Sequence, residues 1–303
     1  MKTRLIVCTA VLTTWATHAG AWHAPGHELA SKVAVAALPD SVPAFLREGA
    51  AAVANYSSEP DLFTKPFCRE ASHVAAAPDH YLDWERVAKL DLQKLPPTRY
   101  EFLKAIYNAG FEPKDVGLLP YSVVEWTDRL AAALAEYRKW PKDKDIRAKC
   151  LLYAGMVAHY AQDLHMPLHT TVHYDGRLDK DGNSPRSGIH LKLDATLGKL
   201  KVDPKEVARA IKVEPLDPDK MLEGVMADFR SSHGKVERVY ELADAIPTYK
   251  EKLEPDSQAA RFARGQLDAA ARLTARLILT AWERSEEIKL PEWHHRPAET
   301  PEE

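Results

Sequence analysis

Two pairs of a histidine and an aspartate, each four residues apart, form the most informative pattern in the sequence. The pairs are His159 with Asp163 and His190 with Asp194. Residues i and i+4 of an α-helix lie on one face, so both side chains of a pair could bind one metal ion. One such pair is more often simply hydrogen-bonded. Two pairs, with His169 between them, all within 36 residues, indicate metal binding instead.

Further candidate ligands precede these pairs. His27, Asp61 and His80 lie in the first third of the chain. Imidazole and carboxylate ligands without thiolate suit zinc with an open or water-bearing position, and they also suit manganese or iron. Several close divalent ions with bridging carboxylates are typical of phosphoester hydrolysis. The helix predicted for 145–165 is apolar, and a bound cation would stabilise the charge that it buries.

Apolar residues recur at helical spacing along most of the chain, and period-two alternation is nearly absent. We therefore expect an all-α fold, a single mainly helical domain with long loops. Segments 57–80 and 171–188, which contain several prolines or glycines, are predicted loops. The predicted helices cover 26–37, 40–54, 99–109, 120–139, 145–165, 187–198, 203–212, 218–246 and 256–286.

Composition excludes several classes of protein. The 303 residues include 41 Lys and Arg against 44 Asp and Glu, so the formal charge is −3. That balance excludes binding to nucleic acid through a generally basic surface. A hydrophobic content of 45% excludes both a multi-span membrane protein and a disordered chain. Three cysteines are too few for a disulfide scaffold.

Residues 1–21 are predicted to be a secretory signal peptide. Lys2 and Arg4 precede a short apolar run, and Ala19-Gly20-Ala21 is a small-residue cleavage signal. The run is too short for a spanning helix, which needs about 20 residues. Cleavage after Ala21 would make Trp22 the N-terminus of a secreted or periplasmic protein.

The mature chain is expected to form one catalytic domain over 22–290, with a loose tail over 291–303. No later stretch is long and apolar enough to span a membrane. In an exported protein Cys68 and Cys150 could form a disulfide, and the sequence leaves that pairing open.

At these residues the sequence resembles the zinc-dependent single-strand nucleases of the S-one/P-one type. That family shares its fold with the bacterial zinc phospholipases C. The resemblance runs from residue 22 to about 194. The matching residues are Trp22, Gly26-His27, Asp61, His80-Tyr81-Leu82-Asp83, the run His159–His169, Asp181-Gly182-Asn183, His190 and Asp194.

The resemblance implies three zinc ions per chain. Their ligands would be Asp61, His80, His159 and Asp163; His169, His190 and Asp194; and His27, Asp163 and the α-amine and carbonyl of Trp22. It further implies an endonuclease that hydrolyses single-stranded DNA or RNA to 5′-phosphate products. A hydroxide between two bridged zinc ions would attack phosphorus, and Asp61 would orient or deprotonate the water from which that hydroxide forms.

Substrate contacts follow less directly from the resemblance. Tyr81 and Asp83 match positions that stack on and hydrogen-bond a base in the nucleases. Thr64 stands where the family usually has an arginine, and Lys65 or Arg69 could supply a cation from the same segment.

A phospholipase C that acts on phospholipid headgroups is the alternative. Those enzymes usually carry a glutamate where Asp194 stands and a shorter segment after the residue matching His169, so Asp194 and the long 171–188 segment favour a nuclease. A metal-binding module without catalysis is a third hypothesis. The sequence does not determine the oligomeric state.

The role of the Trp22 α-amine as a zinc ligand can be tested by extending the N-terminus. One extra residue before Trp22 should lower the zinc content by one equivalent, because the free α-amine would no longer be available as a ligand. Metal analysis of protein that begins at Trp22, beside protein with the extension, checks this. Equal zinc content and equal activity would contradict the assignment of Trp22.

Overall fold

The computed structural model describes residues 23–65, 67–90 and 94–295. The predicted signal peptide, Trp22 and residues 296–303 lie outside the described residues. Helices dominate throughout, and the described part of the chain contains no strand, only two isolated bridges between Leu82 and Gly117 and between Tyr174 and Gly176. The prediction of a single, mainly helical domain is confirmed.

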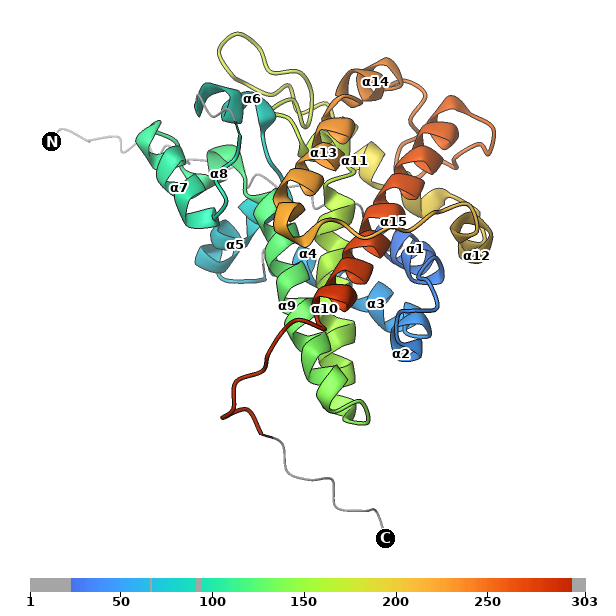
Figure 1. The fold of residues 1–303 in the computed structure, drawn as a ribbon. Coiled ribbons are helices and arrows are strands. Elements are labelled where there is room, and N and C mark those ends of the chain that lie inside the picture. Colours follow the sequence, from blue (N-terminus) through green and yellow to red (C-terminus); the bar gives the residue numbers. More distant parts are fainter. Residues whose placement is uncertain (1–22, 66, 91–93, 296–303) are drawn as a thin grey trace, which may run out of the picture.

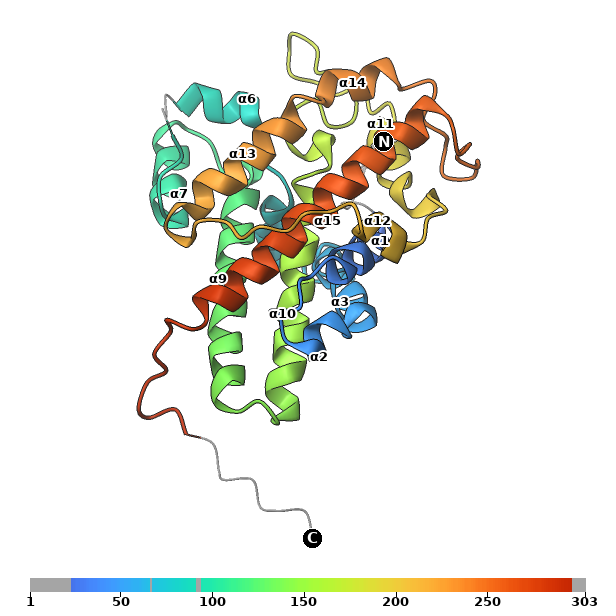
Figure 2. The same cartoon turned by 45° about the vertical axis from the view of Figure 1, so that its right-hand side comes forward.

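Two long helices, α9 (Leu119–Lys139) and α10 (Lys144–Asp163), form the axis of the fold. They lie side by side in both views, joined by a short turn, and α15 (Gln258–Arg284) crosses them (Figure 1, Figure 2). On one side α1 (Ala24–Ala36) and α3 (Ala50–Tyr56) pack together and against α10. This packing buries the C-terminal half of α10 from every side.

Shorter elements complete the domain. The remaining α-helices are α2 (Ala44–Arg47), α4 (Glu59–Phe63), α5 (Glu70–Ala76), α6 (Trp84–Val87), α7 (Arg99–Asn108), α8 (Pro113–Val116), α11 (Ile189–Asp194), α12 (Pro204–Ala208), α13 (Met221–His233) and α14 (Val236–Glu241). The 3₁₀ turns are η1 (Ala77–His80), η2 (Ala88–Leu90), η3 (Pro167–His169), η4 (Leu197–Lys199) and η5 (Pro218–Lys220).

Caps fix the ends of the two helices that matter most. The Asp143 carboxylate accepts from the backbone N–H groups of Asp145 and Ile146 at 2.9 and 3.1 Å and so begins α10. Ser257 begins α15 in the same way, because its hydroxyl accepts from the N–H of Ala260 at 3.0 Å. These caps satisfy backbone N–H donors that the start of a helix leaves without partners.

The prediction of a loop over 57–80 is wrong. That segment contains α4, α5 and η1. Pro60 and Pro78, which suggested a loop, stand in the first turn of α4 and of η1. A first-turn N–H has no partner within the helix, so proline is tolerated there.

Three predicted helices are each divided in the structure. The helix expected over 187–198 becomes α11 and η4. The helix expected over 40–54 becomes α2 and α3, which meet at Gly49. The helix expected over 218–246 becomes η5, α13 and α14, with Gly234 between the last two. Helical spacing of apolar residues continues across such breaks, because the packed face is the same on both sides.

Cys68 and Cys150 are both free, so the disulfide left open by the sequence is not formed. Cys150 is fully buried in α10, and Cys68 is half-buried beside α4. Among the described residues, no helix combines the length and the apolar character that crossing a membrane would need.

Gly155 sets the distance between α10 and α3. A Cβ atom on Gly155 would lie 2.4 Å from Cβ of Tyr56. We expect Gly155→Ala to lower the free energy of unfolding by about 1–3 kcal/mol through overpacking. Gly265, exposed in the middle of α15 with nothing within 4 Å of such an atom, is the control. Gly265→Ala should raise the stability by about 0.5–1 kcal/mol. Denaturant unfolding of both variants checks the signs, and a stabilised Gly155→Ala would contradict the packing argument.

Candidate metal centre

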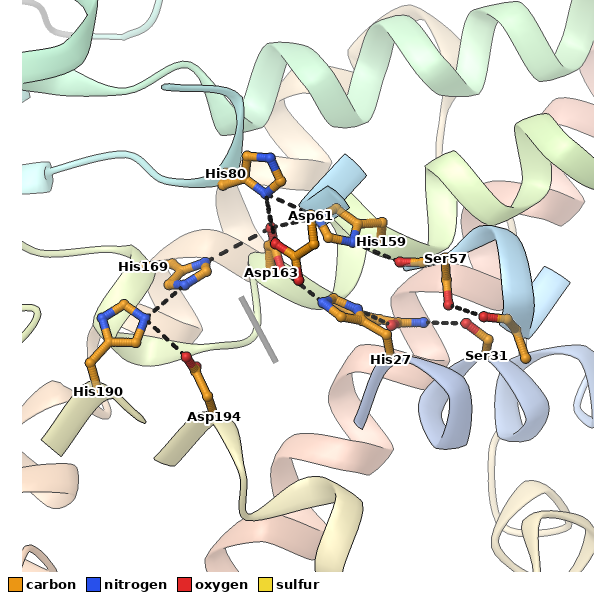
Figure 3. A network of polar contacts seen from close by, with 12 residues as sticks. His27, Ser31, Ser57, Asp61, His80, His159, Asp163, His169, His190 and Asp194 are labelled. Carbon is orange, nitrogen blue, oxygen red and sulfur yellow. Dashed lines mark hydrogen bonds and ion pairs between the residues drawn. The ribbon is translucent and has the colours of Figure 1, made fainter. Parts of the chain in front are cut away.

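Eight of the nine predicted ligands lie close together in the interior (Figure 3). They come from six elements spread over the chain. The ligands and their elements are His27 on α1, Asp61 on α4, His80 on η1, His159 and Asp163 on α10, His169 on η3, and His190 and Asp194 on α11. All eight are buried, with exposed fractions of 0–8%. The ninth, Trp22, lies outside the described residues.

These side chains form three triads whose ligand atoms lie within 4.8 Å of one another. Each triad could hold a metal ion. We name them the first triad (His27, Asp61 and His159), the second triad (His80, His159 and Asp163) and the third triad (His169, His190 and Asp194). The first two share His159 and are therefore contiguous.

The Asp163 carboxylate lies at the centre of the cluster. Its Oδ2 is 3.0 Å from Nδ1 of His80 and 3.2 Å from Nε2 of His159. Its Oδ1 is 3.4 Å from Nε2 of His27, and His169 Nδ1 lies 3.9 Å from Oδ2. One carboxylate thus faces four imidazoles, an arrangement that allows it to bridge two ions.

The second triad has the dimensions of a zinc site. Nδ1 of His80 and Nε2 of His159 are 3.0 Å apart, and each lies 3.0–3.2 Å from Asp163 Oδ2. Ligand atoms at about 2.0–2.1 Å from a tetrahedral zinc ion lie roughly 3.3 Å from one another. The three donor atoms therefore already form a triangle of nearly the right size.

The third triad has similar spacing. Nε2 of His169 is 3.1 Å from Nε2 of His190, and the latter is 3.4 Å from Asp194 Oδ2. Nδ1 of His169 faces Asp163, so the His169 ring is the part of the third triad that lies next to the second.

Several buried polar atoms in the cluster have no hydrogen-bond partner. They are His27 Nε2, Asp61 Oδ1, His80 Nε2, Asp163 Oδ1, His169 Nδ1, His190 Nδ1 and both carboxylate oxygens of Asp194. Buried polar atoms without partners are costly and therefore uncommon. Cations bound among these lone pairs would satisfy them, so the residues present fit a multi-metal centre.

Neighbouring groups orient the imidazoles. Nδ1 of His159 lies 2.7 Å from the carbonyl oxygen of Ser57, to which it donates, so Nε2 keeps its lone pair for the triads. The amide of Gln162 lies 2.6 Å from Nδ1 of His27. With its oxygen toward the ring, the amide accepts from Nδ1–H and leaves Nε2 free for a metal ion. The reversed amide would donate to Nδ1 and place the ring proton on Nε2, which would exclude a metal ion from Nε2. The first orientation is therefore the one consistent with His27 as a ligand.

The carboxylates respond differently to burial. Burial alone would raise the pKa of Asp163, yet His159 and the hydrogen bonds from His159 and His80 hold that pKa well below its usual range. Asp61 follows the same pattern, and its pKa is lowered by His159 and His80 despite burial. Asp194 has no comparable compensation, so burial, then the charges of Asp61 and Asp163, raise its pKa well above the usual value. A cation in the third triad would supply the positive charge that Asp194 needs to remain ionised.

The imidazoles are mostly held neutral, which is the form that binds a metal. Burial, then the neighbouring His159, lowers the pKa of His27 to about 4. Burial also lowers the pKa of His169, and burial together with His169 lowers that of His190 well below its usual value. His159 is the exception, because Asp163 raises its pKa against the effect of burial.

The two predicted substrate-binding residues border the cluster. The backbone N–H of Leu82 donates to the carbonyl of His169 at 2.9 Å, which ties Tyr81 and Asp83 to η3. The Tyr81 hydroxyl donates to the carbonyl of Lys114 at 2.6 Å. Burial, then the charge of Glu85, raises the pKa of Asp83 to about 8.

The grouping partly follows the sets that the resemblance implied. The third triad has the three residues of one implied set. Asp61 groups most closely with His27 and His159, although it also lies 4.0 Å from Nδ1 of His80. His23, which follows Trp22 in the chain, donates its backbone N–H to the carbonyl of Asp194 at 3.3 Å.

Sequence reasoning assigned no role to the groups that orient the ligands. Gln162 is three residues after His159, and helical spacing would have placed both near one face. The Ser57 carbonyl had no detectable signal, because any residue supplies a backbone carbonyl.

No protein-family model matches the sequence, and no curated protein matches it.

Replacing the central carboxylate tests the cluster. We expect Asp163→Asn to reduce the bound zinc by at least one equivalent, because a neutral amide no longer balances the charge of an ion held in the second triad. Asp228→Asn is the control, since Asp228 also faces a buried imidazole, His165 at 3.4 Å, away from the triads. Zinc content measured by mass spectrometry after gel filtration distinguishes them. Equal zinc in both variants would contradict a metal-binding role for Asp163.

Proposed function

We propose that this chain is a secreted or periplasmic phosphodiesterase with three zinc ions, an endonuclease that hydrolyses single-stranded DNA or RNA to 5′-phosphate products. The observation that supports it most directly is the central carboxylate of Asp163, shared between imidazoles of adjacent triads at 3.0–3.4 Å. Ions held by a shared carboxylate lie close enough to act on one phosphate. The resemblance to the S-one/P-one type of nuclease supplies the nucleic-acid substrate.

Bound zinc would lower the pKa of a coordinated water and neutralise charge on the phosphate oxygens. The chain's own contribution is positioning. The triads hold their donor atoms on short, packed elements, and Ser57 and Gln162 fix two of the rings. Rigid ligands need little rearrangement as charge develops in the transition state.

Asp61 is the proposed catalytic base. Its pKa is lowered, so the carboxylate is ionised at neutral pH, and its Oδ1 has no hydrogen-bond partner in the protein. An ionised oxygen without a partner can accept a hydrogen bond from the attacking water and orient it toward phosphorus. Asp61 would combine this role with that of a ligand in the first triad.

Tyr81 and Asp83 are the proposed base-binding residues. Because the Tyr81 hydroxyl is already bonded to Lys114, its ring is held in place at the border of the cluster. With its raised pKa, Asp83 is largely protonated at pH 7 and can donate a hydrogen bond to a base.

A zinc phospholipase C remains a second candidate, because apolar side chains are exposed next to Asp61. Leu62 and Phe63 on α4, with Phe67 and Val74 nearby in the chain, are 48–75% exposed. Exposed apolar side chains of this kind can contact either a lipid surface or unstacked bases.

An assay of three substrates tests the proposal. Single-stranded DNA, single-stranded RNA and phosphatidylcholine vesicles are incubated with zinc-loaded protein that begins at Trp22, with and without a chelator. We expect chelator-sensitive release of 5′-phosphorylated fragments from the nucleic acids. Lipid turnover without nucleic-acid turnover would identify a phospholipase C. Absence of turnover on all three, with zinc bound, would favour a non-catalytic metal-binding protein.

A further inference from the structure

A pocket of about 370 Å³ lies between α6 and the segment 172–186, beside the third triad. In both whole-molecule views this segment arches between α6 and α14 (Figure 1, Figure 2). The pocket is lined by Arg86 and Arg186, by the polar residues Asn183 and Ser184, and by Tyr174, with no acidic residue in its lining. Two guanidinium groups without a carboxylate make a site for an anion.

Arg86 is short of partners. Its guanidinium carbon lies 5.5 Å from the centre of the Phe111 ring, but its Nε is buried and has no hydrogen-bond partner. No acidic residue lines the pocket beside Arg86 and Arg186. Arg99, by contrast, binds Asp79 at 2.5 Å and Glu125 at 2.9 Å. A buried guanidinium N–H without an acceptor carries a free-energy cost that an oxygen of a bound ligand would remove.

The carboxyls near Arg86 do not compensate it. The Glu85 carboxylate accepts from the Thr171 hydroxyl at 2.6 Å and from the backbone N–H of Val172 at 3.0 Å, so it is used to anchor the segment. Asp83, whose pKa is raised to about 8, is largely neutral at pH 7. Arg86 therefore keeps most of its charge for a ligand.

Arg186 is held in an unusual backbone conformation. Its φ of 52° is the one positive value among the described residues other than glycine. Such strain persists where surrounding contacts impose it, and it is common at ligand sites. Here the Arg186 N–H donates to the Ser184 hydroxyl at 3.2 Å, and the guanidinium carbon lies 5.1 Å from the centre of the Tyr174 ring.

The segment that carries Arg186 is anchored from the other side as well. The Tyr240 hydroxyl on α14 donates to the carbonyl of His173 and accepts from the N–H of Gly176 at 3.2 Å. Arg177 pairs with Glu237, also on α14, through two nitrogen–oxygen contacts of 2.9 and 2.5 Å. The pocket is therefore preformed, which lowers the entropy cost of ordering the segment when a ligand binds.

The pocket is close to the metal centre. The Tyr174 ring centre is 5.9 Å from that of His190, so the Arg186 guanidinium carbon lies no more than 11.0 Å from the His190 ring. Phosphates of one strand in B-form DNA follow at about 3.4 Å of axial rise, and an extended strand spaces them more widely. A phosphate one to three nucleotides from the scissile bond would reach the pocket.

We propose that Arg86 and Arg186 bind a second phosphate of the substrate strand, so that substrates are selected by a phosphodiester beyond the one that is cleaved. This rests on the proposed nuclease function. A minimal diester with one phosphate would gain nothing from the pocket. Single-stranded oligonucleotides would be preferred over it through contacts that carry no base specificity.

The test uses Arg86→Gln and Arg186→Gln in zinc-loaded protein. Lys180→Gln is the matched control, because Lys180 is exposed on the same segment but does not line the pocket. Fluorescence anisotropy measures binding of a hydrolysis-resistant single-stranded oligonucleotide at several salt concentrations. Turnover is measured on an unmodified oligonucleotide and on bis(4-nitrophenyl) phosphate.

Each arginine variant should weaken oligonucleotide binding about tenfold and reduce the slope of log affinity against log salt by about 0.7. The kcat/KM for the oligonucleotide should fall about tenfold, and that for the minimal diester should not change. Arginine variants that behave like Lys180→Gln would overturn the inference, as would an equal loss on the minimal diester. Wild-type protein that binds the oligonucleotide but does not cleave it would refute the nuclease proposal alone, since the binding series still tests the pocket.

Discussion

The structure depends on a carboxylate, Asp163, buried without solvent exposure among four imidazoles. A buried charge is tolerated only when it is paired or bound to a metal. Here the neighbouring rings keep the carboxylate ionised, and burial keeps most of the rings neutral. That combination, an anion surrounded by neutral nitrogen donors, is the electrostatic condition for binding divalent cations.

The helical packing and the candidate metal centre therefore depend on each other. α3 approaches α10 closely because Gly155 has no side chain, and the same approach brings the Ser57 carbonyl to His159. Bound metal would in turn stabilise the folded state, because the triads draw together elements far apart in the chain. Loss of metal and loss of packing at Gly155 should thus weaken the same region.

The proposed function would need positive charge that is concentrated at the candidate site. The whole chain carries a formal charge of −3. Positive charge at the candidate site would come from ions in the triads and from Arg86 and Arg186 in the adjacent pocket. If the chain is the proposed nuclease, a strand held at both places is bound through its backbone, independently of base sequence. Exposed Phe63 and Phe67 offer faces on which bases could stack.

The sequence by itself determined the fold class, and it indicated the residue types of the candidate metal sites. Helical spacing is a local property, so it predicted α9, α10 and α15 closely and placed His159 with Asp163 on one face. Proline is ambiguous by contrast, because it occurs both in loops and in the first turn of helices, and this misled the prediction for 57–80. Only the tertiary structure decided which ligands share a triad, since His27 and His159 are brought together by the packing of α1, α3 and α10. It alone also revealed the pocket of Arg86 and Arg186, because contacts between residues so far apart in the chain leave no periodic or spacing signal in the sequence.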